Sequence, residues 1–200
     1  AGSEEWRKSI TLGSMLCSKA DIQRRISLGY AAFNKYQKAW TNKIPLQKRL
    51  ILYEALVVSV LMYNSSCWAA PKANLNKLDV VHRRHLRSIL NYRYPGVISN
   101  VNLYKRCSCE PLSVRVERSR WRMLGHVLRG PVDGPAYTSL SFAVNSLQMP
   151  GRVGRPQTNL FSLIKRDLSD RNLFLNNVND LNYLRNVAFD RAAWRKMQEV

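Results

Sequence analysis

The chain has 200 residues, of which 46% are hydrophobic, and its 32 Lys and Arg against 13 Asp and Glu give a formal net charge of +19 at pH 7. The hydrophobic content excludes a chain that is disordered throughout, and the length suits one domain or two small ones. A charge excess of this size repels itself, which favours nucleic acid as the partner over an anionic membrane or an acidic protein.

The first third of the chain predicts one short strand followed by two helices. An apolar run from Ser9 to Leu16 favours the strand. The next apolar side chains recur at spacings of three, four and seven, on one face of a helix, and they are Ile22, Ile26, Tyr30, Phe33 and Trp40. Pro45 starts a second, more buried helix through Leu61, and we expect the two helices to form a hairpin.

The longest uncharged stretch, residues 55–71, contains polar side chains at 64–66 and ends in a proline. It is too short and too polar for a membrane span, so we interpret it as a buried helix and expect no membrane partner.

The middle third carries a concentrated positive charge. A helix is predicted at about residues 74–91, and Ser99 is a candidate cap for a short helix that follows a Pro-Gly break. The arginines of the first helix that face largely outward are Arg83, Arg84 and Arg87.

A helix that begins after Pro111 and ends near residue 129 has the clearest pattern. Its basic side chains form one stripe at offsets of 0, 3, 7, 11 and 14, namely Arg115, Arg118, Arg122, His126 and Arg129. Its apolar stripe consists of Leu112, Val116, Met123 and Val127. A solvated face normally interleaves acidic residues, and only Glu117 lies nearby, which favours a binding surface. We expect His126 itself to be a hydrogen-bonded structural histidine.

Residues 130–158 hold repeated prolines and glycines and predict an extended linker. Within it, the segment Gly151-Arg152-Val153-Gly154-Arg155-Pro156 fits either an arm that inserts Arg152 and Arg155 into a minor groove or a flexible linker with incidental charge. Two further helices are predicted at about 159–171 and 180–198.

These patterns predict a mainly α fold with at most one short β-strand near the N-terminus. We expect four parts: the strand and helical hairpin at 1–70, a basic helical nucleic-acid-binding region at 71–130, a basic Pro/Gly-rich linker at 131–158 and a helical pair at 159–200.

Several short motifs follow one another along the chain: Leu12-Gly13-Ser14-Met15-Leu16, Arg25-Ile26 with Ala31-Ala32-Phe33, Leu52-Tyr53-Glu54-Ala55-Leu56, His82-Arg83-Arg84, Gly125-His126-Val127-Leu128-Arg129, Gly154-Arg155-Pro156 and Asp190-Arg191-Ala192-Ala193-Trp194. In this order they resemble the C-terminal part of LINE-type (non-LTR) retrotransposon reverse transcriptases. The resemblance covers nearly the whole chain.

The resemblance implies that the first motif ends a polymerase palm, that the helical hairpin is thumb-like, and that the remainder is a basic region holding template RNA and target DNA. The paired aspartates that bind the catalytic metals in that family would lie upstream. Two-metal phosphoryl transfer needs clustered carboxylates. We find no such cluster in the sequence, so we expect no enzymatic activity from this chain.

Arginine suits phosphate oxygens better than lysine because its planar guanidinium donates two parallel hydrogen bonds. The residues predicted to bind nucleic acid are Arg83, Arg84, Arg87, Arg93, Arg115, Arg118, Arg122, Arg129, Arg152 and Arg155. Tyr92 and Tyr94 could stack on unpaired bases, although packing and helix capping explain them as well.

Four cysteines do not form a secreted disulfide pattern, which favours reduced thiols in an intracellular compartment. The sequence leaves open whether this compartment is the nucleus or an organelle in which the chain belongs to a ribonucleoprotein. Cys107 and Cys109 together with His82 and His85 supply zinc-ligand atoms, but the Cys-x-Cys spacing is unusual for structural zinc. We therefore expect no metal and no cofactor.

Two functions fit the sequence. The first is a non-catalytic module that grips RNA or an RNA–DNA hybrid through Arg-rich helices, as part of a retrotransposon-type particle. The second is a reverse-transcriptase-derived structural subunit of a large ribonucleoprotein, such as a ribosome-like particle, where basic faces meet RNA and apolar faces meet other protein subunits.

Overall fold

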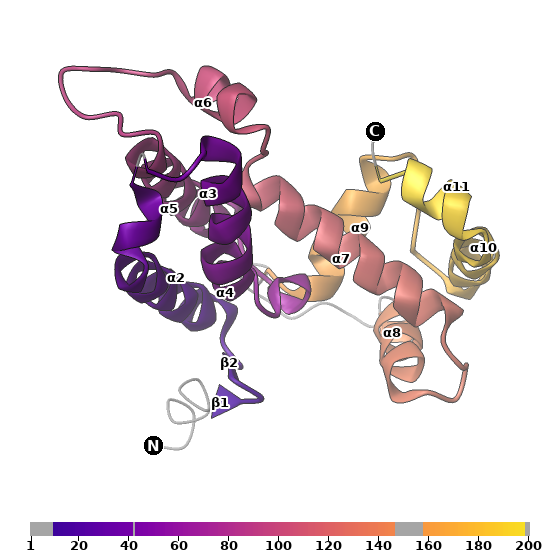
Figure 1. Cartoon of the computed structure of the whole chain (residues 1–200). Helices are drawn as coiled ribbons and strands as arrows, with labels where there is room; N and C mark the ends of the chain where they lie inside the picture. Colours follow the sequence, from indigo (N-terminus) through magenta and orange to yellow (C-terminus); the bar gives the residue numbers. More distant parts are fainter. Residues whose placement is uncertain (1–9, 42, 147–157, 199–200) are drawn as a thin grey trace. The chain divides into compact units, whose positions relative to one another are not determined.

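A computed structural model of the chain describes residues 10–41, 43–146 and 158–198 (Figure 1). These residues belong to two compact units. The described residues of unit 1 fall within Ala1–Ser65 and Ala70–Val116, and those of unit 2 within Ser66–Ala69 and Glu117–Val200. The division falls inside helix α7 (Leu112–Arg129). Each unit is described by itself.

The predicted mainly α fold is confirmed. The N-terminal apolar run does not form one strand, because it folds into two paired strands, β1 (Ile10–Thr11) and β2 (Ser14–Met15), in antiparallel register. The two residues between them reverse the chain, since Leu12 and Gly13 both have positive φ angles, of 49° and 79°. Arg24 donates to the carbonyl oxygen of Gly13 at 2.7 Å and holds this turn against the first helix.

Unit 1 is built on two long helices, α2 (Ser18–Lys35) and α5 (Lys72–Ile89), which pack against each other. Between them, α3 (Leu46–Tyr53), a π-helical turn (Glu54–Val58) and α4 (Ser59–Leu61) form one run that packs on α2 as the predicted hairpin. A Cβ atom at Gly29 would lie 2.4 Å from Cδ2 of Leu61, so glycine permits this close packing.

Shorter elements complete unit 1. A 3₁₀ turn (Gln37–Trp40) follows α2, and α6 (Asn100–Cys107) follows the loop after α5. The predicted cap of α6 is confirmed, because the side chain of Ser99 accepts a hydrogen bond from the backbone N–H of Asn102 at 3.2 Å. A second 3₁₀ turn (Ser65–Cys67) lies at the boundary of the two units.

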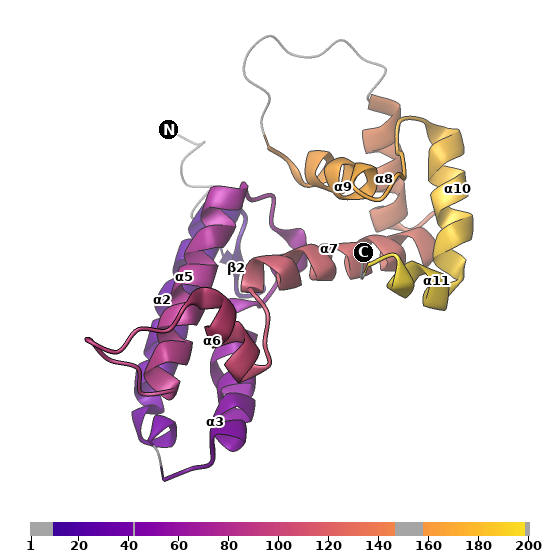
Figure 2. The same ribbon diagram turned by 90° about the horizontal axis from the view of Figure 1, so that it is seen from above.

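Unit 2 gathers α8 (Pro135–Asn145), α9 (Leu160–Ser169), α10 (Val178–Phe189) and α11 (Arg191–Lys196) around the C-terminal part of α7 (Figure 2). Its buried core is shared by all of these helices and includes Trp121, Leu124, Leu128, Leu140, Val144, Leu168, Leu184 and Trp194. The predicted apolar stripe of α7 is therefore wrong at Met123 and Val127, which are only partly buried.

Two predictions for the last third are wrong. The linker predicted at 131–158 contains α8, which starts with Pro135 in its first turn and buries Tyr137, Leu140 and Val144. The single helix predicted at 180–198 is two helices, because Asp190 leaves the helical conformation and its side chain caps α11, accepting from the backbone N–H groups of Ala192 and Ala193. Within the described ranges, no helix combines the length and the apolar content needed to cross a membrane.

Candidate nucleic-acid interface

Two tryptophans, Trp121 of α7 and Trp194 of α11, join these two helices. The rings of Trp121 and Trp194 stack with centroids 4.4 Å apart and an interplanar angle of 13°. Each indole N–H donates to the backbone carbonyl of the other residue, at 3.0 Å from Trp121 and 3.3 Å from Trp194. A Cβ atom at Gly125 would lie 2.4 Å from Nε1 of Trp194, so only glycine leaves room for the indole. We call this arrangement the tryptophan pair.

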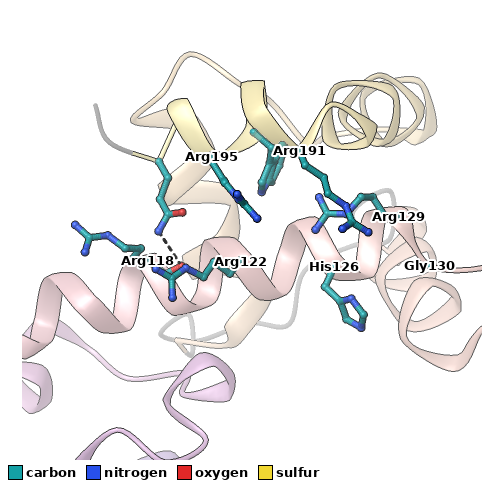
Figure 3. A pocket seen from close by; sticks show the side chains of 9 residues that line it. Arg118, Arg122, His126, Arg129, Gly130, Arg191 and Arg195 are labelled. Atoms are coloured by element: carbon teal, nitrogen blue, oxygen red, sulfur yellow. Dashed lines mark hydrogen bonds between the residues drawn. The ribbon is translucent and has the colours of Figure 1, made fainter. Parts of the chain in front are cut away.

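The tryptophan pair sets the spacing of an open groove between α7 and α11, with a volume of about 840 Å³ (Figure 3). Five arginines line it: Arg118, Arg122 and Arg129 from α7, and Arg191 and Arg195 from α11. Figure 3 shows Arg195 extending from α11 toward α7 and Arg191 close to Arg129. We call this surface the arginine groove.

The arginine groove is uniformly positive. The described residues that line it include no Asp or Glu. Burial and then the neighbouring guanidiniums of Arg191 and Arg195 lower the pKa of Arg129 below its ordinary value. An arginine nevertheless stays protonated in proteins, so the groove keeps its charge and would release repulsion energy on binding an anion.

Other arginines of unit 2 are structural. Arg120 is buried and donates from Nε to Asp167 at 2.6 Å. Arg171 lies over the ring of Trp121, and Arg185 donates to the carbonyl oxygens of Leu128 and Gly130 at 2.7 and 2.9 Å. Arg129 makes a similar contact, since its guanidinium donates to the carbonyl oxygen of Ala188 at 2.9 Å, but unlike these three arginines it lines the groove.

Unit 1 carries a second group of arginines. Arg83, Arg84, Arg87 and Arg93 line a shallow pocket of about 550 Å³ on α5 and the loop after it. Arg87 is held by Asn100, whose Oδ1 accepts at 2.7 Å, and Arg83 donates to the hydroxyl of Tyr104 at 3.5 Å. Arg84 and Arg93 are exposed. We call this surface the α5 arginine pocket.

The structure therefore brings seven of the predicted residues together in two sets, and Arg115 lines neither surface. Although Arg115 continues the α7 stripe in sequence, both of its terminal nitrogens bond the carboxylate of Glu54, one of them at 2.9 Å, within unit 1. The predicted binding residues Arg152 and Arg155 lie outside the described residues.

Sequence reasoning missed Arg191 and Arg195. They lie three residues before and one residue after Trp194, so both flank the core face of α11 and line the groove beside it. The short segment Asp-Arg-Ala-Ala-Trp-Arg could have revealed them, because an aspartate that caps a helix followed by two arginines four residues apart defines a basic face.

The predicted structural role of His126 is wrong, because His126 is exposed and lines the groove. Its imidazole extends from the side of α7 away from α11 (Figure 3).

The two tyrosines after α5 differ from each other. The hydroxyl of Tyr92 accepts from Arg106 at 3.1 Å, as a packed residue does, whereas Tyr94 is 96% exposed.

The other two histidines are core residues. His82 and His85 are both buried, and each Nδ1 lies within hydrogen-bond distance of the Tyr53 hydroxyl, at 3.0 and 3.3 Å. That hydroxyl has one proton, so it donates to one imidazole and accepts from the other, which requires two different tautomers. Among residues 10–41, 43–146 and 158–198, no group of three or more His, Cys, Asp or Glu could hold a metal ion.

Unit 1 should lose stability in mild acid. Burial first, and then nearby arginines or the neighbouring imidazole, lower the pKa of both His82 and His85 from 6.5 to about 4. Below pH 6.5 these two imidazoles therefore bind protons in the unfolded chain but stay neutral in the folded chain. The free energy of unfolding consequently falls from pH 6.5 toward pH 4. We expect the free energy of unfolding to drop by roughly 2–3 kcal/mol between pH 7.5 and 5.5 in urea titrations.

A variant at one of the two histidines checks the cause of this pH dependence. His85→Phe removes one of the two buried imidazoles and should remove about half of the loss. An equal pH dependence in the variant and the unaltered chain would rule out His85 as a cause.

Comparisons with protein-family models, with curated proteins and with solved structures gave no match to this chain.

Proposed function

We propose that this chain is a non-catalytic nucleic-acid-binding domain that holds RNA or an RNA–DNA hybrid through the phosphates. The observation that carries the proposal is the arginine groove, in which five arginines from two helices face one open surface and no described lining residue is a carboxylate. Such a surface is costly in repulsion unless a polyanion occupies it.

The chemistry of the groove favours phosphates over other anions. Guanidinium groups bind phosphate oxygens in pairs of parallel hydrogen bonds, and a row of them matches a chain of phosphates. The groove is open and elongated along α7, where Arg118, Arg122 and Arg129 are spaced by about one and two turns. A continuous backbone fits this arrangement better than a single small anion does.

The groove would position nucleic acid without reading its sequence, because contacts to phosphates carry no base information. The net charge of +19 and the resemblance to the C-terminal region of LINE-type reverse transcriptases support the same proposal. We infer from that resemblance that the domain originated in such an element.

The salt dependence of binding tests the proposal. Fluorescence anisotropy with a short labelled duplex should give a linear fall of log affinity with log salt, with a slope of about 0.9 per phosphate neutralised. Replacing Arg122 and Arg195 by Ala should reduce that slope by about 1–2, because each removes one phosphate contact. An unchanged slope would place the contacts elsewhere, and no measurable binding at low salt would refute the proposed function.

A further inference from the structure

A second pocket in unit 1 combines aromatic and polar side chains. It has a volume of about 650 Å³, within the range of small-molecule sites, and lies between the end of α2 with its following 3₁₀ turn and the C-terminal half of α5. Tyr30, Phe33 and Trp40 supply rings, and the side-chain amides of Asn34 and Gln37 lie at its exposed edge. We call it the aromatic pocket.

The aromatic part of this pocket is rigid. Phe33 stacks on His85 with centroids 4.1 Å apart and an interplanar angle of 2°, and on its other neighbour Trp40 at 5.1 Å. The indole N–H of Trp40 donates to the carbonyl of Phe33 at 2.8 Å. The half-buried ring of Tyr30, by contrast, lies below the guanidinium of Arg84 at 5.8 Å, at the open side.

A buried polar atom at the pocket has no partner. His85 lines the aromatic pocket and is 2% exposed, its Nδ1 faces Tyr53, and its Nε2 has no hydrogen-bond partner among the described residues. A ligand that hydrogen-bonds this nitrogen would give a buried polar atom the partner that it otherwise lacks.

The aromatic pocket continues into the α5 arginine pocket. Four residues line both, namely Arg84, Ser88, Asn91 and Arg93. Asn91 takes a left-handed conformation (φ 60°) that ends α5, and its N–H bonds the carbonyl of Ser88 at 3.0 Å, which fixes where the chain leaves toward Arg93. Rings with hydrogen-bonding edges thus adjoin a cluster of guanidiniums.

We propose, building on the proposed function, that the aromatic pocket takes an unpaired base of a bound single strand while the α5 arginine pocket holds the adjoining phosphates. Unpaired bases are recognised by stacking on aromatic rings or guanidinium planes and by hydrogen bonds to their edges. A paired base exposes no free face, so the pocket discriminates single strands from duplexes. The arginine groove of unit 2 makes no such distinction.

Abasic oligonucleotides test this inference. A short single strand and its abasic counterpart carry the same phosphates, so the arginines alone would bind both equally. We expect the strand with bases to bind about tenfold more tightly, by fluorescence anisotropy at moderate salt. The variants Tyr30→Leu and Asn34→Leu should remove most of that preference and leave the affinity for a blunt duplex unchanged.

The control is Tyr36→Leu, which changes a half-buried tyrosine at the end of α2 that does not line the pocket. It should keep the preference for bases. Equal affinity for normal and abasic strands would overturn the pocket inference and leave the proposed function intact. If the unaltered chain bound neither the two strands nor the duplex, the proposed function itself would be refuted. Free nucleotide binding as tightly as the strand would overturn the assignment to a strand.

Discussion

Charge reversal at Arg122 and Arg195 together should weaken RNA binding well over tenfold at moderate salt, because two phosphate contacts are lost and two repulsions replace them. Both side chains are exposed, and they approach the arginine groove from different helices. Neither belongs to the core of unit 2, so helicity by circular dichroism should stay unchanged. Binding would be measured by fluorescence anisotropy with a labelled RNA duplex of the same length as the duplex in the salt titration.

The matched control reverses charge outside the groove. Arg166 and Lys196 are exposed residues of unit 2, on α9 and α11, and neither lines the groove. The double variant Arg166→Glu with Lys196→Glu alters the net charge by the same amount as the groove variant does. We expect it to weaken binding only a few-fold through the general field. Equal losses in the two variants would mean that total charge, and not the groove, governs affinity.

The arginine groove could be predicted only in part. The α7 stripe follows from helical periodicity, and Arg118, Arg122 and Arg129 do share one surface. Periodicity within one helix cannot reveal partners from distant segments, however. Glu54 lies 61 residues before Arg115 and pairs with it, while α11 supplies Arg191 and Arg195 from the far end of the chain. Which arginines are available is decided by tertiary packing.

Predictions of the fold likewise agree with the structure where they depend on neighbouring residues in the sequence. The predicted cap at Ser99 and the hairpin of unit 1 agree with the structure, because both depend on neighbouring residues. The linker prediction overlooks helix α8 because repeated prolines and glycines are typical of linkers, whereas Pro135 stands in the first turn of α8, where a proline is favoured. The break at Asp190 was missed because its two flanking helices share an apolar pattern, including Leu184 and Trp194.

The tryptophan pair should be the most sensitive structural element of unit 2. Trp194→Ala removes a stacked, buried indole and its N–H donor, and it leaves the Trp121 carbonyl without this hydrogen bond. We expect unfolding free energy to fall by about 3–5 kcal/mol in urea denaturation, as for other large-to-small core substitutions. Phe174→Ala changes a ring that is 59% exposed and should cost less than about 1 kcal/mol.

For Gly125→Ala, the sign of the change in unfolding free energy tests whether the Trp194 indole fills the space beside Gly125. In an ordinary helix interior, alanine in place of glycine stabilises by about 1 kcal/mol. At position 125 the added Cβ would lie 2.4–3.0 Å from three atoms of the rigid Trp194 indole, so the indole must move. Overpacking of this kind costs about 1–3 kcal/mol. Destabilisation together with weaker duplex binding is therefore expected, since Trp194 positions Arg191 and Arg195. A stabilised variant with unchanged affinity would show that the tryptophan pair does not set the groove.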